Sequence, residues 1–229
     1  MNRKEMTARA RAKFQEKFTL QMVVIFVVFT VAVLSFAIIA DEVGEQETLA
    51  VDTFVLQTIH SMSTPFLDAV VPIITDIGGV TGGVLLTAFV CGLFLLRDQR
   101  RRAVIVAVSV AGAAGLNVIL KALFERSRPD LWDRLVVEHS YSFPSGHAMA
   151  SAALGISLAA VLWNSRWRWW GFTAGLSYMV VIGFTRLYLG VHYPTDIIAG
   201  WCVSAAWVAI VVAMVTSRLG RIAVPKKLD

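Results

Sequence analysis

The segment from residue 141 to residue 155 reads YSFPSGHAMASAALG, and it joins a charged loop to a long apolar run. After Pro144 the residues are small and mostly apolar for the length of a helix. His147 nevertheless stands in the first turn of that helix. Ionisable side chains are costly inside a membrane and tend to mark functional sites there. The segment therefore predicts a membrane helix whose first turn belongs to a functional site.

The composition of the whole chain indicates an integral membrane protein of one domain. Of its 229 residues, 57% are hydrophobic and only 16% are charged, whereas a soluble domain carries about 25% charged residues. The mean hydropathy is +0.67. The charges are clustered, and the apolar stretches between them approach the ~20 residues that a helix needs to cross a bilayer. We therefore predict an all-α fold, an integral membrane bundle of six transmembrane helices with a short interfacial amphipathic helix.

The positions of the apolar residues predict where these helices lie. The segment 51–66 has apolar residues at helical spacing, which is typical of an amphipathic helix at the membrane interface. The glycine-rich stretch 78–83, GGVTGG, predicts a loosened or kinked start to the second span. The six predicted spans cover residues 18–40, 72–96, 103–124, 145–163, 170–188 and 194–216.

The distribution of Lys and Arg predicts the orientation of the spans. Because cytoplasmic segments carry an excess of these residues, we expect both termini in the cytoplasm and the multi-pass chain in the cell (inner) membrane. The basic segments are residues 1–17, 97–102, 164–169 and 218–229, and the outward-facing segments are 41–65, 125–143 and 189–193. The predicted organisation is a basic N-terminal segment, 1–17, a membrane domain, 18–217, and a basic tail, 218–229.

Charge and cysteine content argue against several other kinds of protein. The net charge of +5 does not indicate a nucleic-acid partner, because the basic residues flank apolar spans. Cys91 and Cys202 both lie inside apolar runs, so we expect buried thiols and neither a disulfide nor a metal site. The oligomeric state stays open.

The outward-facing segments hold polar residues that have both a structural and a functional interpretation. Lys121 and Arg128 could be charges at a helix end that reach toward the membrane surface. Ser145 could be an N-cap, with Gly146 allowing close packing. Asp196 could complement the dipole of the helix that it opens. Each residue taken alone therefore leaves both interpretations open.

Taken together, these residues favour a site for an anion that carries several oxygen atoms. Cations, histidines and a carboxylate converge on one side of the membrane from three helix ends. Arginine matches the geometry of phosphate, lysine adds a point charge, and a helix N-terminus supplies N–H groups. The candidate residues are Lys121, Arg128, Ser145, Gly146, His147, Arg186, His192 and Asp196.

The two histidines fit nucleophilic and acid–base chemistry. Asp196 follows His192 by four residues, within reach of its ring. A carboxylate that accepts one ring N–H leaves the other nitrogen free and more nucleophilic. His147 suits a general acid that protonates a departing oxygen. No cluster of carboxylates offers a site for Mg²⁺ or Mn²⁺, so we expect no metal and no other cofactor, with the cations neutralising phosphate instead.

Three stretches of the sequence resemble the signature motifs of the type-2 phosphatidic acid phosphatase superfamily. KALFERSRP, at 121–129, is similar to K-x6-R-P, PSGH, at 144–147, to P-S-G-H, and TRLYLGVHYPTD, at 185–196, to S-R-x5-H-x3-D. Thr185 stands where the family pattern has serine, and it keeps the hydroxyl group. The motifs occur in the expected order, at the outward ends of the predicted spans.

The resemblance implies a role for each matching residue. The residues that would bind the phosphate are Lys121, Arg128, Ser145, Gly146 and Arg186. His192 would be the nucleophile that forms a phosphohistidine, His147 the acid, and Asp196 the partner that orients His192. Members of the family act on lipid phosphates without a metal cofactor, so the resemblance implies a membrane lipid phosphatase.

The sequence leaves the substrate and part of the function open. Undecaprenyl diphosphate, phosphatidylglycerol phosphate and phosphatidic acid all carry a terminal phosphate that such a site could hydrolyse at the outer membrane face. A lipid phosphotransferase could use the same site. A non-enzymatic lipid or anion transporter is a further alternative, although its charges would lie nearer to mid-membrane. His139, in the polar loop, could contact a head group.

Overall fold

The computed structural model describes residues 3–45 and 50–223, with side chains for residues 15, 16, 18–45 and 50–216. Within these ranges the chain forms helices joined by turns and loops, so the expected all-α fold is confirmed. The basic residues of both terminal segments lie outside the described side chains. The helices are α1 (Arg3–Gly44), α2 (Ala50–His60), α3 (Pro65–Gly78), α4 (Val80–Leu96), α5 (Arg100–Phe124), α6 (Gly146–Leu162), α7 (Arg168–Tyr188) and α8 (Pro194–Ala223).

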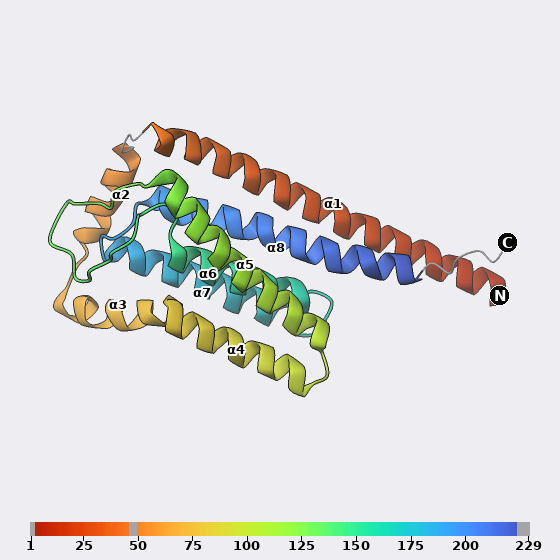
Figure 1. The fold of residues 1–229 in the computed structure, drawn as a ribbon. Coiled ribbons are helices and arrows are strands. Elements are labelled where there is room, and N and C mark those ends of the chain that lie inside the picture. The colour runs from red at the N-terminus through yellow and green to blue at the C-terminus, as the bar shows by residue number, and fades with distance from the viewer. Residues whose placement is uncertain (1–2, 46–49, 224–229) are drawn as a thin grey trace.

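The helices run back and forth along one direction, so that their connections gather at two ends (Figure 1). The start of α1, the end of α8 and the turns after α4 and α6 lie at one end. α2, the long loop between α5 and α6 and the turn between α7 and α8 lie at the other end. The segments that the basic residues assign to one side therefore share one end of the bundle. Which end faces the cytoplasm stays a prediction.

Several of the described helices are long and apolar enough to cross a bilayer. They are Phe18–Gly44 within α1, the whole of α5, and Pro194–Thr216 within α8. α3 and α4 add a fourth if the bent pair is one span. α6 is apolar but has only 17 residues, and α7 is not among the membrane-capable helices. Length and composition of the described helices thus support three or four spans, and the count of six stays a prediction.

The outer surface of the bundle carries large apolar side chains, whereas small residues let the helices approach inside it. Phe26, Phe89 and Val118 expose 68%, 62% and 70% of their surface. Soluble proteins rarely expose large continuous apolar surfaces, so these side chains fit a lipid environment. Inside, a Cβ on Gly155 would lie 2.5 Å from the backbone oxygen of Gly175, so α6 and α7 meet backbone to backbone.

The predicted kink in the glycine-rich stretch is confirmed. α3 ends at Gly78, α4 begins at Val80, and the two helices are bent by 52°. A Cβ on Gly78 would lie 2.4 Å from the Ile182 side chain of α7, so the glycine permits this close contact. A Cβ on Gly79 would lie 3.4 Å from Nε2 of His147. The break in the span therefore borders one of the candidate catalytic side chains.

The segment 51–66, predicted as one amphipathic helix, is divided between α2 and α3. The Thr64 side chain accepts a hydrogen bond from the Leu67 backbone N–H at 3.3 Å and so caps α3. This cap starts the helix before the expected position near residue 72, so both predicted boundaries were wrong. α2 also contributes Asp52, whose carboxylate is fully buried. A buried carboxylate needs polar partners, and those of Asp52 lie at the end of the bundle that holds the three motifs.

Candidate active site

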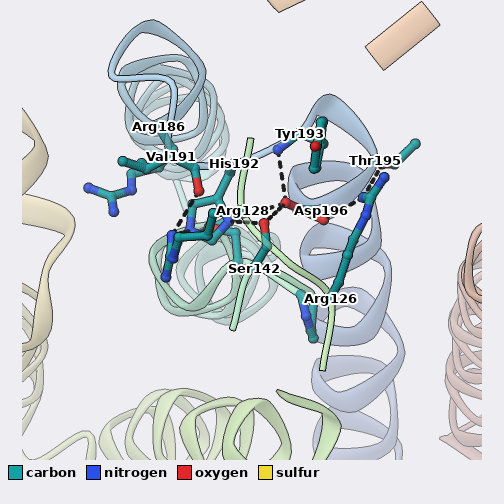
Figure 2. A network of polar contacts seen from close by, with 12 residues as sticks. Arg126, Arg128, Ser142, Arg186, Val191, His192, Tyr193, Thr195 and Asp196 are labelled. Carbon is teal, nitrogen blue, oxygen red and sulfur yellow. Dashed lines mark hydrogen bonds and ion pairs between the residues drawn. The ribbon is translucent and has the colours of Figure 1, made fainter. Parts of the chain in front are cut away.

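His192 and Asp196 form a buried pair between the end of α7 and the start of α8 (Figure 2). His192 is 2% exposed, and Asp196 is fully buried. Nδ1 of His192 lies 3.3 Å from Oδ2 of Asp196. The turn before them includes Gly190 at a φ of +66°, which glycine adopts without a steric penalty. The spacing of four residues therefore places the imidazole against the carboxylate.

The partners of His192 define which ring nitrogen carries its proton. Nε2 lies 3.2 Å from Nη1 of Arg128, and a guanidinium group can only donate. Nε2 must therefore accept, and Nδ1 carries the proton toward Asp196. Burial lowers the pKa of His192 to about 4, although the Asp196 carboxylate acts in the opposite direction. At neutral pH the ring is uncharged, with its lone pair directed at Arg128.

Asp196 is held by donors from several segments of the chain (Figure 2). Oδ2 accepts hydrogen bonds from the Ser142 hydroxyl and from the Tyr193 backbone N–H, the latter at 2.8 Å. Oδ1 accepts from Nη1 of Arg126 at 2.7 Å. The same guanidinium lies over the Tyr193 ring, 4.1 Å from its centroid. These contacts fix the carboxylate plane and leave Asp196 little freedom to turn away from His192.

Arg186, in the last turn of α7, is 1% exposed and lies beside this pair. Nη1 donates to Oγ1 of Thr75 at 3.0 Å, and Nη2 forms an ion pair with Glu138. In the described part of the chain, Nε is buried without a hydrogen-bond partner. Buried donors are rarely left unsatisfied. Arg186 therefore has a donor to offer to an additional acceptor such as a phosphate oxygen.

Glu138 joins the two arginines. One of its oxygens pairs with Arg186, and the other lies 3.7 Å from Nη2 of Arg128. Burial favours the neutral acid, but Arg186 and Arg128 outweigh it and hold the pKa of Glu138 below its usual value. The carboxylate is therefore ionised, and it occupies donors that an incoming anion would use.

Lys121 and Arg128 both bind the loop at Ser140. Nζ of Lys121 donates to the Ser140 hydroxyl at 3.1 Å and to the Tyr141 carbonyl oxygen. Arg128 donates from Nε to the Ser140 carbonyl oxygen at 2.8 Å and from Nη1 to the Val191 carbonyl oxygen at 2.7 Å. The two cations of the first motif thus hold the same stretch of the loop, and Arg128 is the one that contacts His192.

The start of α6 brings the second motif to the same place. The Ser145 side chain accepts from the Ala148 backbone N–H at 3.4 Å, so its interpretation as an N-cap is confirmed. Its own backbone N–H donates to the Asp196 carbonyl oxygen at 3.1 Å, which ties α6 to α8. A Cβ on Gly146 would lie 3.0 Å from Oδ1 of Asn117, so the glycine also makes room for α5. A contact of Ser145 or Gly146 with phosphate stays a prediction.

His147 follows in the first turn of α6 and is half-buried. It is close enough to Arg186, His192 and Glu138 to interact with them electrostatically. The structure therefore brings together all eight candidate residues, from α5, the loop after it, α6, α7 and the start of α8. The three motifs, far apart in the sequence, meet at one end of the bundle.

Sequence reasoning missed several side chains that complete the site. Ser142 lies next to the second motif. The others carried no signal, because they are single polar residues in segments read as amphipathic or apolar. The missed residues are Asp52, Thr75, Asn117 and Ser142. Arg126 and Glu138, charged residues of the polar loop, read from the sequence as loop ion pairs that could also contact the substrate, and both do form ion pairs. Thr75 also accepts a hydrogen bond at 3.0 Å from the hydroxyl of Thr185, the residue that stands where the family pattern has serine.

A hollow of about 670 Å³ lies over the loop between α5 and α6. Arg128 and Glu138 belong to its wall, together with Arg134 and His139. His139 is thus placed where it could contact a head group, which stays a prediction. Among the residues that the structure describes, no three His, Cys, Asp or Glu side chains are grouped to hold a metal ion. Independence from metal is likewise a prediction.

The sequence profile of the PAP2 superfamily matches residues 102–219, more than half of the chain. The chain belongs to the PAP2 superfamily. Phosphatidylglycerophosphatase B of Bacillus subtilis (strain 168) is 29% identical over 174 residues, which cover 73% of this chain and 85% of that protein. Undecaprenyl-diphosphatase BcrC of the same organism is 27% identical over 158 residues, which cover 66% and 77%.

A solved structure of another PAP2 protein extends the similarity to the fold. It is described as the first transmembrane PAP2 type phosphatidylglycerolphosphate phosphatase from Bacillus subtilis. It matches with a TM-score of 0.69 and 25% sequence identity, over 87% of this chain and 98% of that chain. The family and the enzyme class expected from the three motifs, a lipid phosphatase of the membrane, are therefore confirmed.

Proposed function

We propose that this PAP2 enzyme hydrolyses the terminal phosphate of a lipid phosphate or lipid diphosphate through a phosphohistidine intermediate. The observation that carries the proposal is the buried pair of His192 and Asp196, with Nε2 of His192 3.2 Å from Arg128. A neutral imidazole beside arginines can attack a phosphorus atom whose oxygens those arginines bind. The names of the two bacterial relatives support lipid phosphates and lipid diphosphates as the substrate class.

Phosphate binding would use the cations that surround this pair. Lys121, Arg128 and Arg186 supply charged donors, Gly146 at the N-terminus of α6 supplies a backbone N–H group, and Ser145 contributes its side chain. Glu138 has to release the two arginines when phosphate arrives, since both anions need the same donors. The bound phosphate would also satisfy Nε of Arg186, which is buried and unpaired in the described structure.

In the first step, Nε2 of His192 attacks the phosphorus atom while Arg128 donates to a phosphate oxygen. The P–N bond forms as the P–O bond to the lipid breaks, and His147 gives a proton to the departing oxygen. Asp196 accepts the hydrogen bond from Nδ1 and stabilises the positive charge on the ring. Water then attacks the phosphohistidine and loses a proton to His147. Inorganic phosphate leaves, and both histidines return to their first protonation states.

We further propose that the site faces outward from the cell membrane, on a domain of six spans over residues 18–217. The position of the motifs at the end of the bundle opposite the basic turns supports this orientation (Figure 1). α6 and α7 would complete the six spans, because they run alongside the longer apolar helices. The basic segments 1–17 and 218–229 would then lie on the cytoplasmic side.

Trapping the covalent intermediate tests the proposed nucleophile. Purified enzyme is mixed with a lipid substrate labelled in the terminal phosphate and quenched without acid, because phosphohistidine is acid-labile. Wild type should hold label on the protein, whereas His192→Ala should hold none. Label retained in His192→Ala would overturn the assignment.

The leaving group separates the two histidines. A lipid alkoxide departs poorly without a proton, whereas p-nitrophenolate departs unaided. His147→Ala should therefore lose far more activity on a lipid monophosphate than on p-nitrophenyl phosphate, with a diphosphate between the two. Equal losses on every substrate would exclude His147 as the acid. A second lipid is then added as a possible phosphate acceptor, and the labelled products are analysed. Label on that lipid would indicate phosphotransfer, whereas labelled inorganic phosphate would indicate hydrolysis.

A further inference from the structure

A second buried carboxylate lies behind the catalytic pair. Asp52, on α2, is fully buried, and its Oδ2 lies 3.1 Å from Nη2 of Arg126. Its two oxygens also accept hydrogen bonds from Thr195, from the backbone N–H at 3.0 Å and from the hydroxyl at 2.6 Å. The other end of the same guanidinium, Nη1, donates to Asp196 at 2.7 Å. Arg126 therefore bridges two carboxylates, and only one of them touches His192.

We infer that Asp52 and Arg126 are positioning residues that set the orientation and the effective charge of Asp196 for His192. The inference rests on the proposed role of His192 as the nucleophile. Arg126 is the donor that fixes Oδ1 of Asp196, which leaves Oδ2 for the ring (Figure 2). Asp52 in turn fixes Arg126, because it occupies the second arm of the guanidinium. Helix α2 thereby becomes part of the site without approaching the phosphate.

The charges of the three side chains explain why a second carboxylate is useful. Arg126 alone would neutralise Asp196, and a neutralised carboxylate stabilises a positive imidazole poorly. With Asp52 present, the three groups together carry a net negative charge next to His192. That charge favours the phosphohistidine, in which the ring is positive. Asp52 therefore lets Arg126 orient Asp196 without cancelling its charge.

Replacing either residue changes this charge in opposite directions. Asp52→Asn removes the negative charge, so protonation of His192 becomes harder and its pKa falls. Arg126→Gln removes the positive charge, so the pKa of His192 rises. The other charged groups that face His192 stay in place: Arg128 from the loop, Arg186 from α7, His147 from α6 and Asp196 from α8, with Lys121 from α5 facing Asp196.

The test measures kcat/KM for p-nitrophenyl phosphate from pH 4 to pH 8, as the ratio of variant to wild type, so that substrate ionisation cancels. The nucleophile is active when neutral. As pH falls, the ratio should therefore rise for Asp52→Asn and fall for Arg126→Gln. At pH 7 both variants should lose kcat roughly tenfold to a hundredfold, the range for one charged hydrogen bond, with KM nearly unchanged.

The double variant Asp52→Asn/Arg126→Gln separates charge from geometry. It restores the net charge next to His192, so the ratio of its kcat/KM to that of the wild type should not change with pH. Its kcat should stay low, because Oδ1 of Asp196 lacks its charged donor. It also serves if Arg126→Gln alone fails to fold, since it leaves one buried carboxylate without a cation, Asp196, where Arg126→Gln leaves two. In that case the comparison of Asp52→Asn with the double variant carries the test.

A matched control removes a carboxylate from a structural contact at the same end of the bundle. Asp68 accepts a hydrogen bond from the Tyr188 hydroxyl at 2.6 Å and does not touch the catalytic pair. Asp68→Asn should lower thermal stability without giving the ratio a pH dependence. Flat ratios for Asp52→Asn and for Arg126→Gln would mean that the network is merely structural. Label trapped on His192→Ala would instead overturn the nucleophile itself, so the two failures are distinguishable.

Discussion

Replacing Arg186 with lysine would show whether the site needs the guanidinium geometry or only a positive charge. Nη1 of Arg186 donates to Thr75 at 3.0 Å, Nη2 pairs with Glu138, and Nε is buried without a partner in the described residues. Lysine offers one ammonium group at the end of a flexible chain and cannot reproduce this fork. In Arg186→Lys, at least one charged hydrogen bond to the phosphate should therefore be lost.

The expected loss follows from the number of donors. A hydrogen bond to a charged group contributes roughly 1.5–3 kcal/mol, and about 1.4 kcal/mol corresponds to a tenfold change in rate. Losing one donor should lower kcat/KM by roughly tenfold to a hundredfold. If a second donor to the developing charge is also lost, the decrease should approach about a thousandfold.

The assay follows inorganic phosphate released from phosphatidylglycerol phosphate in mixed detergent micelles, with the thermal unfolding midpoint measured in parallel. Arg100→Lys is the matched control, because that side chain is 83% exposed and begins α5, at the opposite end of the bundle. It should retain the kcat/KM of the wild type. A wild-type kcat/KM in Arg186→Lys would refute the idea that this guanidinium binds the reacting phosphate, and would leave it a structural or membrane-anchoring role.

Three further outcomes are expected. Since burial lowers the pKa of His192 to about 4, kcat/KM for p-nitrophenyl phosphate, whose leaving group needs no proton from His147, should hold from pH 7 to about pH 5 after correction for substrate ionisation and fall only near pH 4; a fall centred on pH 6.5 would mean an ordinary, exposed histidine. Thorough chelation with EDTA should leave phosphate release unchanged, and a loss restored by Mg²⁺ alone would contradict charge neutralisation by Lys and Arg. In a background lacking Cys91 and Cys202, an impermeant thiol reagent applied to intact cells should label Asp130→Cys and not Arg100→Cys, and the reverse pattern would invert the proposed orientation.

Much of the site could be predicted from the sequence because its residues come in short, ordered motifs. His192 and Asp196 are four residues apart, and local backbone geometry alone brings such a pair within reach. Ser145 at the start of an apolar run predicts an N-cap, and the structure has one. The membrane class followed from composition, because a bilayer requires long apolar segments whatever the details of their packing.

The sequence was less informative about the helix boundaries near α2 and about which polar residues of α2 are buried. The amphipathic pattern of 51–66 has the same appearance whether the helix lies on a membrane surface or closes the end of a bundle. Thr64 and Pro65 start a new helix inside that pattern, and a period-based reading passes over such a local signal. Asp52 looked like one of several acidic residues in an outward segment, yet it is fully buried.

The sequence by itself determined the membrane class, the family and the eight side chains that surround the proposed phosphate site, since these depend on residue type and short-range spacing. Only the tertiary structure decided that Glu138 bridges Arg186 and Arg128, and that Arg126 links Asp52 on α2 to Asp196 on α8. Asp52 and Arg126 are 74 residues apart in the chain. Nothing local couples positions so distant. They meet because buried charges are stable only when paired, and the packing of α2 across the end of the bundle supplies the partner.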